Sequence, residues 1–329
     1  MSASVTAGWT EDQLLAAARA GDEEAFRTLL APHLSALHLH CYRMLGSYHD
    51  AEEAMQEVLL RAWRSLGTYA GRAPLRHWLY RIATTTSLKA GAARARLPGT
   101  IDEIDFLEPY PDRLLDMLPV DADPAAAAER RESVSLAFVA ALQLLPATQR
   151  AALILHDVLA FRADEIAELL DCSIAAVNSL LQRARATMGA ANPRHTTRPL
   201  DTDDRQVLAR FVDAWHRHDI AALAGVLRED VVMRMPPEGM HFLGRTAVVD
   251  FFVTVPAGGR FETIHLVPTR SNGQPALAAF DTEAGMQPYG LMVLTMAAGG
   301  IAAIVGFPTQ HRPAFERALE LSPSGAHHR

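Results

Sequence analysis

The chain has 329 residues, and its length, composition and charge already exclude several classes of protein. At about 100–200 residues per domain, this length predicts two or three domains. Hydrophobic residues make up 49% and charged residues 21%, and no apolar run reaches the roughly 20 residues that cross a bilayer, so we expect soluble domains and no membrane. The two cysteines, Cys41 and Cys172, and an N-terminus without a secretory pattern predict a reducing cytoplasm.

The formal net charge of −7 is concentrated in one part of the chain. Residues 97–145 contain 3 basic and 10 acidic side chains, which accounts for the whole excess. Residues 172–199 contain no acidic side chain but four arginines. An acidic protein can therefore still present a local basic surface to nucleic acid.

Residues 10–96 carry apolar side chains at spacings of three and four, which predicts three or four helices in a first helical domain. Residues 97–125 are rich in proline and aspartate, which disfavours both helix and packed core and predicts a linker. Helical periodicity returns over 126–192 and is broken by the polar, proline-containing run that follows.

A helix, a tight turn and a second helix are predicted between residues 163 and 188. Ser173 can cap the second helix, which has an apolar stripe at helical spacing. The opposite surface carries side chains of the types that reach base edges and phosphates in a major groove: Asn178, Ser179, Gln182, Arg183 and Arg185. A plain amphipathic helix pair explains the stripe equally well, and the acid-free surface favours a DNA-binding helix-turn-helix.

The hydrophobic pattern of the sequence changes after Asp201. Two amphipathic stretches, 203–217 and 219–228, predict helices and are followed by β-rich runs. Gly299-Gly300 separates the last two of these runs and predicts a β-hairpin turn. The last third of the chain is therefore expected to be an α+β domain.

Two separated blocks resemble the extracytoplasmic-function group of bacterial RNA polymerase sigma factors, of the sigma-70 type. Leu145-Pro146-Ala147-Thr148-Gln149-Arg150, with the helix pair that follows it, is similar to region 4, which binds the −35 element. Residues 50–63 are similar to region 2.2, and residues 69–83 to regions 2.3 and 2.4. The resemblance covers most of residues 10–190 in the right order, and it implies core RNA polymerase and promoter DNA as partners.

The resemblance assigns roles to two sets of region 2 residues. One set would contact the polymerase: Glu53, Gln56, Glu57 and Arg61. On spacing alone, a solvated charged face fits these residues as well. The other set would capture a flipped −10 base and line the melted strand, where aromatic and guanidinium planes suit unstacked bases: Tyr69, Gly71, Arg72, His77, Trp78, Tyr80 and Arg81. A place in the core stays open for Trp78 and Tyr80.

Two departures from the family pattern leave the promoter preference open. Thr84-Thr85-Thr86 stands where the family often has an asparagine-containing turn, and Asn178-Ser179-Leu180 stands where many relatives carry Arg-Ser-Arg. In the linker, residues 107–112 resemble a sub-group of these factors that bears an extra C-terminal domain. The acidic linker fits either a mimic of nucleic acid in the polymerase cleft or a solvated spacer.

Residues 201–318 resemble that extra domain, a SnoaL-like member of the NTF2-like cone fold. The similarity includes residues 211–215, 242–245 and 272–276. Such cones enclose a pocket between a curved sheet and helices. Our candidate pocket residues, with a small-molecule ligand as candidate partner, are Trp215, Met235, His241, Phe252, His265 and Phe280. No ionisable residue here stands in a spacing that specifies chemistry, so a structural or surface role is expected for each.

The sequence therefore predicts a multidomain protein: two all-α sigma domains joined to an α+β cone that regulates them. We expect no enzyme activity, no cofactor and no metal. The cluster His38-Leu39-His40-Cys41 is assigned to packing, because adjacent helical positions point in different directions. Two alternatives stay open: a SnoaL-type isomerase, cyclase or hydrolase fused to a DNA-binding module, and a repressor-type DNA binder, which leaves Glu53, Gln56 and Glu57 unexplained.

Overall fold

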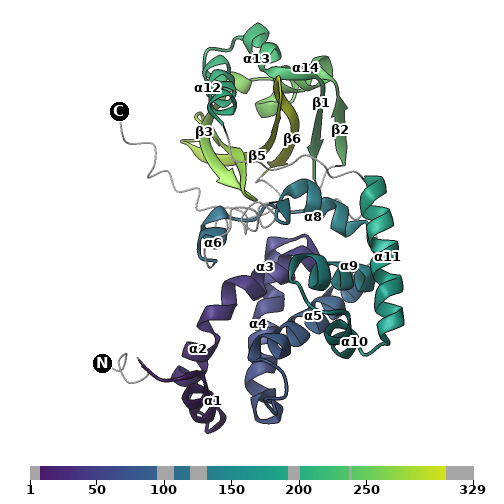
Figure 1. Ribbon diagram of the computed structural model, residues 1–329. Helices are drawn as coiled ribbons and strands as arrows, with labels where there is room; N and C mark the ends of the chain where they lie inside the picture. Colours follow the sequence, from purple (N-terminus) through teal and green to yellow (C-terminus); the bar gives the residue numbers. More distant parts are fainter. Residues whose placement is uncertain (1–7, 95–106, 119–131, 192–200, 237–238, 309–329) are drawn as a thin grey trace. The chain divides into compact units, whose positions relative to one another are not determined.

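The computed structural model describes residues 8–94, 107–118, 132–191, 201–236 and 239–308 (Figure 1). The chain divides into two compact units. The first combines Met1–Thr100 with Leu142–Ala190, and the second combines Ile101–Ala141 with Ala191–Arg329. Within the described residues the first unit is helical and the second contains the sheet, which agrees with the predicted fold class.

The N-terminal part of the first unit is a bundle of helices. Its elements are α1 (Glu11–Arg19), α2 (Glu23–Leu30), η1 (Ala31–His33), α3 (Leu34–Leu45), α4 (Tyr48–Ser65), η2 (Leu66–Thr68) and α5 (Leu75–Arg94). Thr10 caps α1 and Ser47 caps α4 through side-chain bonds to backbone N–H groups. Helices α3, α4 and α5 pack on one another, and their shared core contains Leu37, Tyr42, Val58, Leu79 and Ala83.

The rest of the first unit contains the predicted helix-turn-helix. Helix α8 (Leu136–Gln143) crosses from the second unit into the first and is followed by α9 (Ala147–Leu153), η4 (Ile154–Val158), α10 (Ala163–Leu170) and α11 (Ile174–Ala191). Asp171 adopts a left-handed conformation, φ 52°, in the turn between α10 and α11. The Ser173 hydroxyl accepts a hydrogen bond from the N–H of Ala176 at 3.2 Å. The helix, turn and second helix expected over 163–188 are confirmed.

A buried arginine that sequence reasoning missed joins the two halves of this unit. Arg150 is 7% exposed, and its guanidinium donates to the carbonyls of Leu142, Gln143 and Leu145 at 2.9–3.0 Å. It also donates to the carbonyl of Met44 at the end of α3. A charge this deeply buried is tolerated because its donors are hydrogen-bonded. Arg150 is the last residue of the motif 145–150 that resembles region 4. In the structure its role is to hold α3 and the segment before α9 together through buried hydrogen bonds.

The second unit contains a six-stranded sheet in the order β2-β1-β6-β5-β4-β3. Its strands are β1 (Leu227–Met235), β2 (Met240–Leu243), β3 (Ile264–Ser271), β4 (Gln274–Asp281), β5 (Gln287–Ala297) and β6 (Gly300–Pro308). Strands β1 and β6 pair in parallel, and the other neighbours are antiparallel. Ala297 pairs with Gly300, so the predicted hairpin is present and its loop is Ala298-Gly299.

Helices cover one face of the curved sheet (Figure 1). They are α12 (Thr202–His216), α13 (Ile220–Val226) and α14 (Arg245–Thr254), followed by the short turns η5 (Pro256–Gly258) and η6 (Phe261–Thr263). The helices expected over 203–217 and 219–228 are thus confirmed. The core of the unit lies between them and the sheet and includes Phe211, Trp215, Phe252, Leu266, Leu294 and Ile304.

Part of the predicted linker is ordered and belongs to the second unit. Leu107 and Tyr110 are buried, α6 spans Asp112–Asp116, and Pro111 forms an isolated antiparallel bridge with Ser271. This corrects the expectation that residues 97–125 disfavour helix and core. The proline and aspartate content lowers the intrinsic tendency of the segment to form helix or core. Contacts with a distant hairpin turn override this tendency. The remainder of that range lies outside the described residues.

The buried imidazole of His40 should make the first unit sensitive to acid. Its ring packs edge-on to Tyr80, and burial lowers its pKa from 6.5 to about 3. Between pH 6.5 and 3 the unfolded chain binds a proton that the folded unit excludes, so stability falls as pH falls. We expect about 2 kcal/mol less protection of α3 and α5 amides at pH 5 than above pH 7, measured by hydrogen exchange.

The variant His40→Gln is the control for this prediction. It should flatten the pH dependence at α3 and α5 while leaving the amides of the second unit unaffected. An unchanged pH slope in the variant would assign the acid sensitivity to other groups.

Candidate functional site

Helix α4 presents an exposed charged face on a buried apolar one. Ala54, Val58 and Ala62 are almost completely buried. Glu53 and Gln56 are exposed and Glu57 is partly exposed. Within α4, His49 lies 3.4 Å from Glu53 and Arg61 lies 2.5 Å from Glu57. Leu60 on the same helix is an exposed apolar residue at 49%. The predicted polymerase-binding residues therefore lie together on one solvent-facing surface.

A groove of about 630 Å³ lies in the first unit between the loop before α5, α5 itself and α10. Five of the predicted −10 residues line it: Tyr69, Arg72, His77, Trp78 and Arg81. The facing wall comes from Phe161 and from the start of α10, with Arg162, Asp164, Glu165 and Glu168. The structure thus brings most of the predicted set together, and it places them opposite the first helix of the helix-turn-helix.

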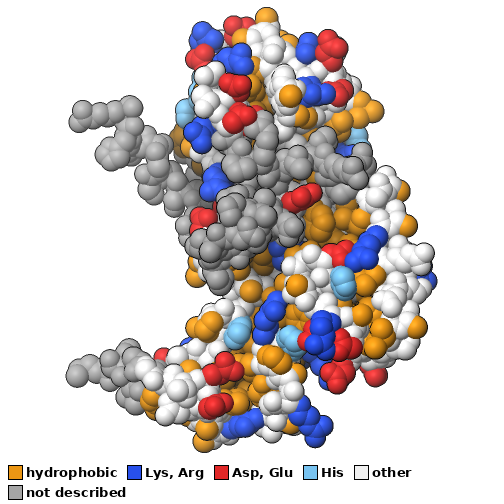
Figure 2. Space-filling model, viewed as in Figure 1, with side chains coloured by type: hydrophobic (Ala, Val, Ile, Leu, Met, Phe, Trp, Pro, Cys, Tyr) orange, Lys and Arg blue, Asp and Glu red, His pale blue; other side chains and the backbone are white. Residues whose placement is uncertain are grey.

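The two walls of the groove have complementary charge. His77 Nδ1 lies 3.7 Å from a Glu165 oxygen, and the His77 ring lies 4.5 Å from the ring of Phe161. A hydrogen bond from Arg162 lowers the pKa of Asp164 to about 2, so this carboxylate is charged at neutral pH. In Figure 2 acidic and basic side chains lie side by side over α9 and α10. The acidic start of α10 therefore faces a surface whose own charged side chains are basic.

Two predicted −10 residues do not line the groove. Tyr80 is 3% exposed, and its ring packs on His40 at 5.2 Å and on Phe161 at 5.6 Å. It is a core residue, which corrects its predicted place at the DNA surface, because on α5 it falls on the same buried side as Leu79 and Ala83. Gly71 lies in the exposed loop before α5 with φ 69°, a conformation that favours glycine.

Arg76 is a groove-edge residue that sequence reasoning missed. Its guanidinium lies 5.3 Å from the Tyr80 ring and 5.1 Å from the Phe161 ring, and it donates to the carbonyl of Leu159 at 3.1 Å. These contacts join α5 to the segment before α10. The sequence places Arg76 beside His77 and Trp78, which could have marked it as part of the −10 surface. No spacing pattern, however, could have predicted its contacts with Leu159 and Phe161, more than eighty positions away.

Helix α11 exposes the predicted −35 set. Asn178, Ser179, Gln182 and Arg183 are exposed, while Val177, Leu181 and Ala184 are buried. Arg185 is also exposed, but it forms a two-pronged ion pair with Asp157 of η4 at 2.6 and 3.1 Å. Partial burial raises the pKa of Asp157, but hydrogen bonds from Arg185 and His156 lower it by more, and the pKa lies below its ordinary value. Arg185 therefore holds α11 against η4, and Arg183 forms no ion pair with any described residue.

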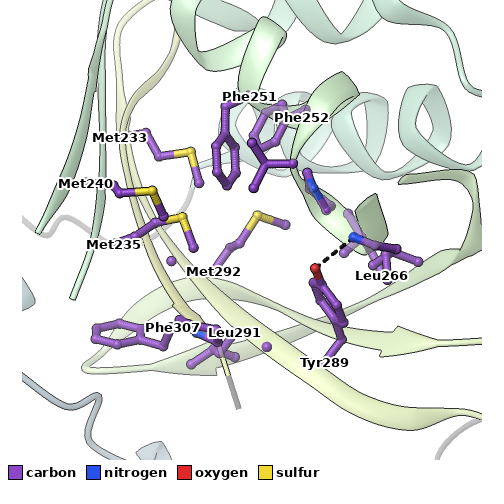
Figure 3. A pocket seen from close by; sticks show the side chains of 18 of the residues that line it. Met233, Met235, Met240, Phe251, Phe252, Leu266, Tyr289, Leu291, Met292 and Phe307 are labelled. Carbon is purple, nitrogen blue, oxygen red and sulfur yellow. Dashed lines mark hydrogen bonds between the residues drawn. The ribbon is translucent and has the colours of Figure 1, made fainter. Parts of the chain in front are cut away.

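A cavity of about 370 Å³ lies between the sheet and the helices of the second unit (Figure 3). Trp215, Met235 and Phe252 line it as predicted. Three predicted residues are not among its lining residues: His241, His265 and Phe280. Successive side chains of a strand point to opposite faces, so Met240, Ile264 and Ala279 line the cavity while their neighbours His241, His265 and Phe280 point away. His265 instead stacks on His216 at 4.5 Å.

Two sequence motifs that lie far apart in the chain meet in the second unit. The segment 107–112 resembled a linker sub-group, and residues 272–276 contributed to the cone resemblance. Tyr110 N–H donates to Asn272 Oδ1 at 2.7 Å, and Asn272 N–H donates to the Tyr110 carbonyl at 2.9 Å. Gly273 N–H donates to the buried carboxylate of Asp112 at 2.8 Å. The structure therefore assigns a joint role to residues 161 and 162 positions apart.

The segment before α8 is held by the same turn. Asn272 Nδ2 donates to the carbonyl of Val134 at 2.8 Å, and Leu136 N–H donates to Gln274 Oε1 at 2.9 Å. We call this whole set of contacts the linker tie; its members are Tyr110, Asp112, Val134 and Leu136 on one side and Ser271, Asn272, Gly273 and Gln274 on the other. Ser271, Asn272 and Gln274 are almost fully buried.

The described residues offer neither a metal site nor a helix that spans a membrane. Within the described ranges, no group of three or more His, Cys, Asp or Glu side chains could hold a metal ion. Burial raises the pKa of Cys41 to about 12, so its thiol stays protonated. None of the described helices is long and apolar enough to cross a bilayer.

Family models match three parts of the chain. Residues 29–96 match Sigma-70 region 2, residues 135–188 match Sigma-70 region 4, and residues 208–304 match a SnoaL-like domain. The matched ranges coincide with the helical bundle around α4 and α5, the helix-turn-helix and the cone.

Individual proteins are similar over most of this length. The chain is 38% identical over 309 residues to ECF RNA polymerase sigma factor SigG of Mycobacterium tuberculosis, covering 88% of this chain and 82% of that protein. It is 32% identical over 203 residues to SigJ of the same organism, 61% of each protein. The crystal structure of SigJ matches the fold with a TM-score of 0.61 at 24% identity, over 91% of this chain and all of that one. The chain belongs to the extracytoplasmic-function RNA polymerase sigma factors and carries a SnoaL-like C-terminal domain.

Proposed function

We propose that the C-terminal domain regulates this sigma factor by holding the segment that joins region 2 to region 4. Promoter-directed transcription initiation itself follows from the family and from the matched regions 2 and 4. The observation that carries the regulatory proposal is the linker tie, which fastens the described part of the linker and the start of region 4 to one hairpin turn of the cone. The site of action is the cytoplasm, where core RNA polymerase is found.

Three surfaces divide the work of initiation in this proposal. The exposed face of α4 binds core RNA polymerase through Glu53, Gln56, Glu57 and Arg61. The groove beside α5 receives the melted −10 strand, because it combines aromatic rings with basic side chains. The exposed face of α11 enters the major groove at the −35 element, with Arg183 suited to a guanine edge or a phosphate.

In this arrangement, DNA and α10 compete for the same −10 surface. The carboxylates of Asp164, Glu165 and Glu168 line the same groove as Arg72, His77 and Arg81. A DNA strand and these carboxylates would both be attracted by the same basic side chains, so DNA has to displace α10 from the groove. The described conformation is therefore a closed state of regions 2 and 4, and initiation requires it to open.

The linker tie favours the closed state. Residues 107–118 follow region 2 and residues 132–141 include the start of region 4, and the tie anchors both on the same turn. Anchoring shortens the reach of the linker, because fewer residues remain to span between the two regions. Release of the tie restores that reach and allows regions 2 and 4 to separate as polymerase and promoter require.

A transcription assay tests this regulation. The full chain and residues 1–199 are compared with core RNA polymerase on a promoter with −35 and −10 elements, at equal amounts of polymerase-bound sigma factor. We expect at least threefold more run-off transcript from residues 1–199, because no cone remains to hold the linker. A template without the promoter is the control. Equal or lower activity of the shortened chain would contradict regulation by restraint.

We also propose that the cone binds its ligand without converting it. Among the described residues that line the cavity there is no Asp, Glu, His, Lys or Arg, and general acid–base catalysis needs such a group within hydrogen-bond reach of the substrate. The placement of His241 and His265 away from the cavity supports the same reading.

A further inference from the structure

The cavity of the cone has a chemical character that limits what it can hold. Its described walls are mainly aromatic and aliphatic, with Trp215, Phe251, Phe252, Phe307 and Leu291 among them. At about 370 Å³ it falls within the range of pockets that hold drug-sized molecules, roughly 300–1,000 Å³. The cavity is not fully enclosed, and its lining residue Val255 is 45% exposed, so a ligand has a route of entry.

Four methionines converge on this space. The side chains of Met233, Met235, Met240 and Met292 extend toward one another from three strands (Figure 3). Methionine has three rotatable bonds and a polarizable sulfur, so such a wall adapts its shape to a guest. Met233 and Met292 are buried while Met235 and Met240 are partly exposed, which places the adaptable wall both inside the cavity and at its opening.

Among the described residues that line the cavity, Tyr289 supplies the one side-chain hydrogen-bond donor that is not engaged within the protein. The other candidate, the indole N–H of Trp215, already donates to the carbonyl of Ile264 at 2.8 Å. The Tyr289 hydroxyl accepts from the N–H of Ala257 at 2.9 Å, and no described residue accepts the hydroxyl hydrogen. A hydroxyl group is donor and acceptor at once, so this hydrogen is available to a guest.

The same tyrosine shapes the entrance. Ala257 lies in the turn after α14 with φ 50°, a left-handed conformation that is costly for alanine. Its N–H is the group that Tyr289 accepts from, so the hydroxyl holds this turn in place beside the cavity. The turn lines the cavity together with Val255, which is 45% exposed. Tyr289 is therefore placed where a guest meets both the rim and the interior.

We propose that the cavity binds a neutral, mainly apolar molecule with one hydrogen-bond acceptor, and that Tyr289 donates to that acceptor. A charged molecule is disfavoured because no described lining side chain carries a compensating charge, and burial of an unpaired charge is expensive. The inference rests on the proposed role of the cone as a regulatory domain, since it names the class of molecule that this domain would sense.

Binding is tested with the full chain and without polymerase, so its failure cannot be confused with a failure of the regulatory proposal. Nile red, a neutral dye that fluoresces in apolar surroundings, is the probe, and three naphthalenes of similar size compete with it. 2-Acetonaphthone carries an acceptor, 2-ethylnaphthalene carries none, and 2-naphthoate carries a negative charge. We expect 2-acetonaphthone to displace the dye about fivefold more strongly than 2-ethylnaphthalene and at least tenfold more strongly than 2-naphthoate.

Two kinds of variant locate the site. Tyr289→Phe should remove the preference for 2-acetonaphthone over 2-ethylnaphthalene, and this ratio is insensitive to a general loss of affinity. Met235→Trp should fill the cavity and weaken dye binding at least tenfold, while Leu243→Trp, at a position 72% exposed on the neighbouring strand, should not. No dye binding by the full chain, equal displacement by 2-naphthoate, or a preference retained in Tyr289→Phe would each overturn the proposal.

Discussion

Replacement of both Glu53 and Glu57 by alanine will abolish run-off transcription, with a loss of at least a hundredfold at sub-saturating polymerase. Both side chains lie on the solvent-facing side of α4, opposite the buried Ala54, Val58 and Ala62. Their removal therefore leaves the core of the bundle unaltered. Loss of charges that pair across a protein interface costs several kcal/mol when the partner charges stay buried and unpaired. A pull-down with core RNA polymerase and a transcription assay measure the effect.

The control changes the same amount of charge elsewhere in the same bundle. Glu23 and Glu24 are exposed at the start of α2, so Glu23→Ala with Glu24→Ala removes two carboxylates outside α4. Circular dichroism should show native helix content for both double variants. A folded Glu53/Glu57 variant that binds polymerase as well as the control would remove α4 from the interface.

Asn272→Ala will detach the linker from the cone and raise transcription toward that of residues 1–199. The amide side chain accepts from Tyr110 N–H and donates to the Val134 carbonyl, and both of these groups are left without that partner in the variant. Each buried backbone group that loses its partner costs about 1–3 kcal/mol. Hydrogen exchange should therefore accelerate at residues 107–118 and 132–141 by one to three orders of magnitude, while the strands of the cone keep their protection.

Backbone strain has to be separated from the lost hydrogen bonds, because Asn272 has φ 56° and alanine is disfavoured there. Asn272→Gly relieves the strain and still removes the side chain, so it should release the linker as alanine does. Gly285→Ala places alanine at φ 74° in another turn, with no atom near its Cβ, and should leave the linker protected. A protected linker in Asn272→Gly would show that the tie does not depend on this side chain.

Much of the fold and of the site follows from local features of the sequence. The helix-turn-helix was predicted because the apolar stripe through Val177, Leu181 and Ala184 and the capping Ser173 are short-range patterns that any packed context preserves. The cone helices and the final hairpin were predicted for the same reason. The prediction of which side of α4 is exposed was also correct, since burial of Ala54, Val58 and Ala62 leaves Glu53 and Gln56 on the opposite face.

The sequence by itself determined the faces of single helices, because these depend on spacings of three to five residues. It also determined the family and the order of the domains, through motifs that resemble sigma factors and the SnoaL-like domain. Only the tertiary structure decided which distant groups meet. Tyr80 is buried against Phe161, Arg185 pairs with Asp157, and Tyr110 bonds to Asn272, and these pairs are separated by 81, 28 and 162 positions. Contacts between distant positions depend on how whole elements pack. The sequence around an aromatic ring or a charged group does not identify its partner in the folded protein.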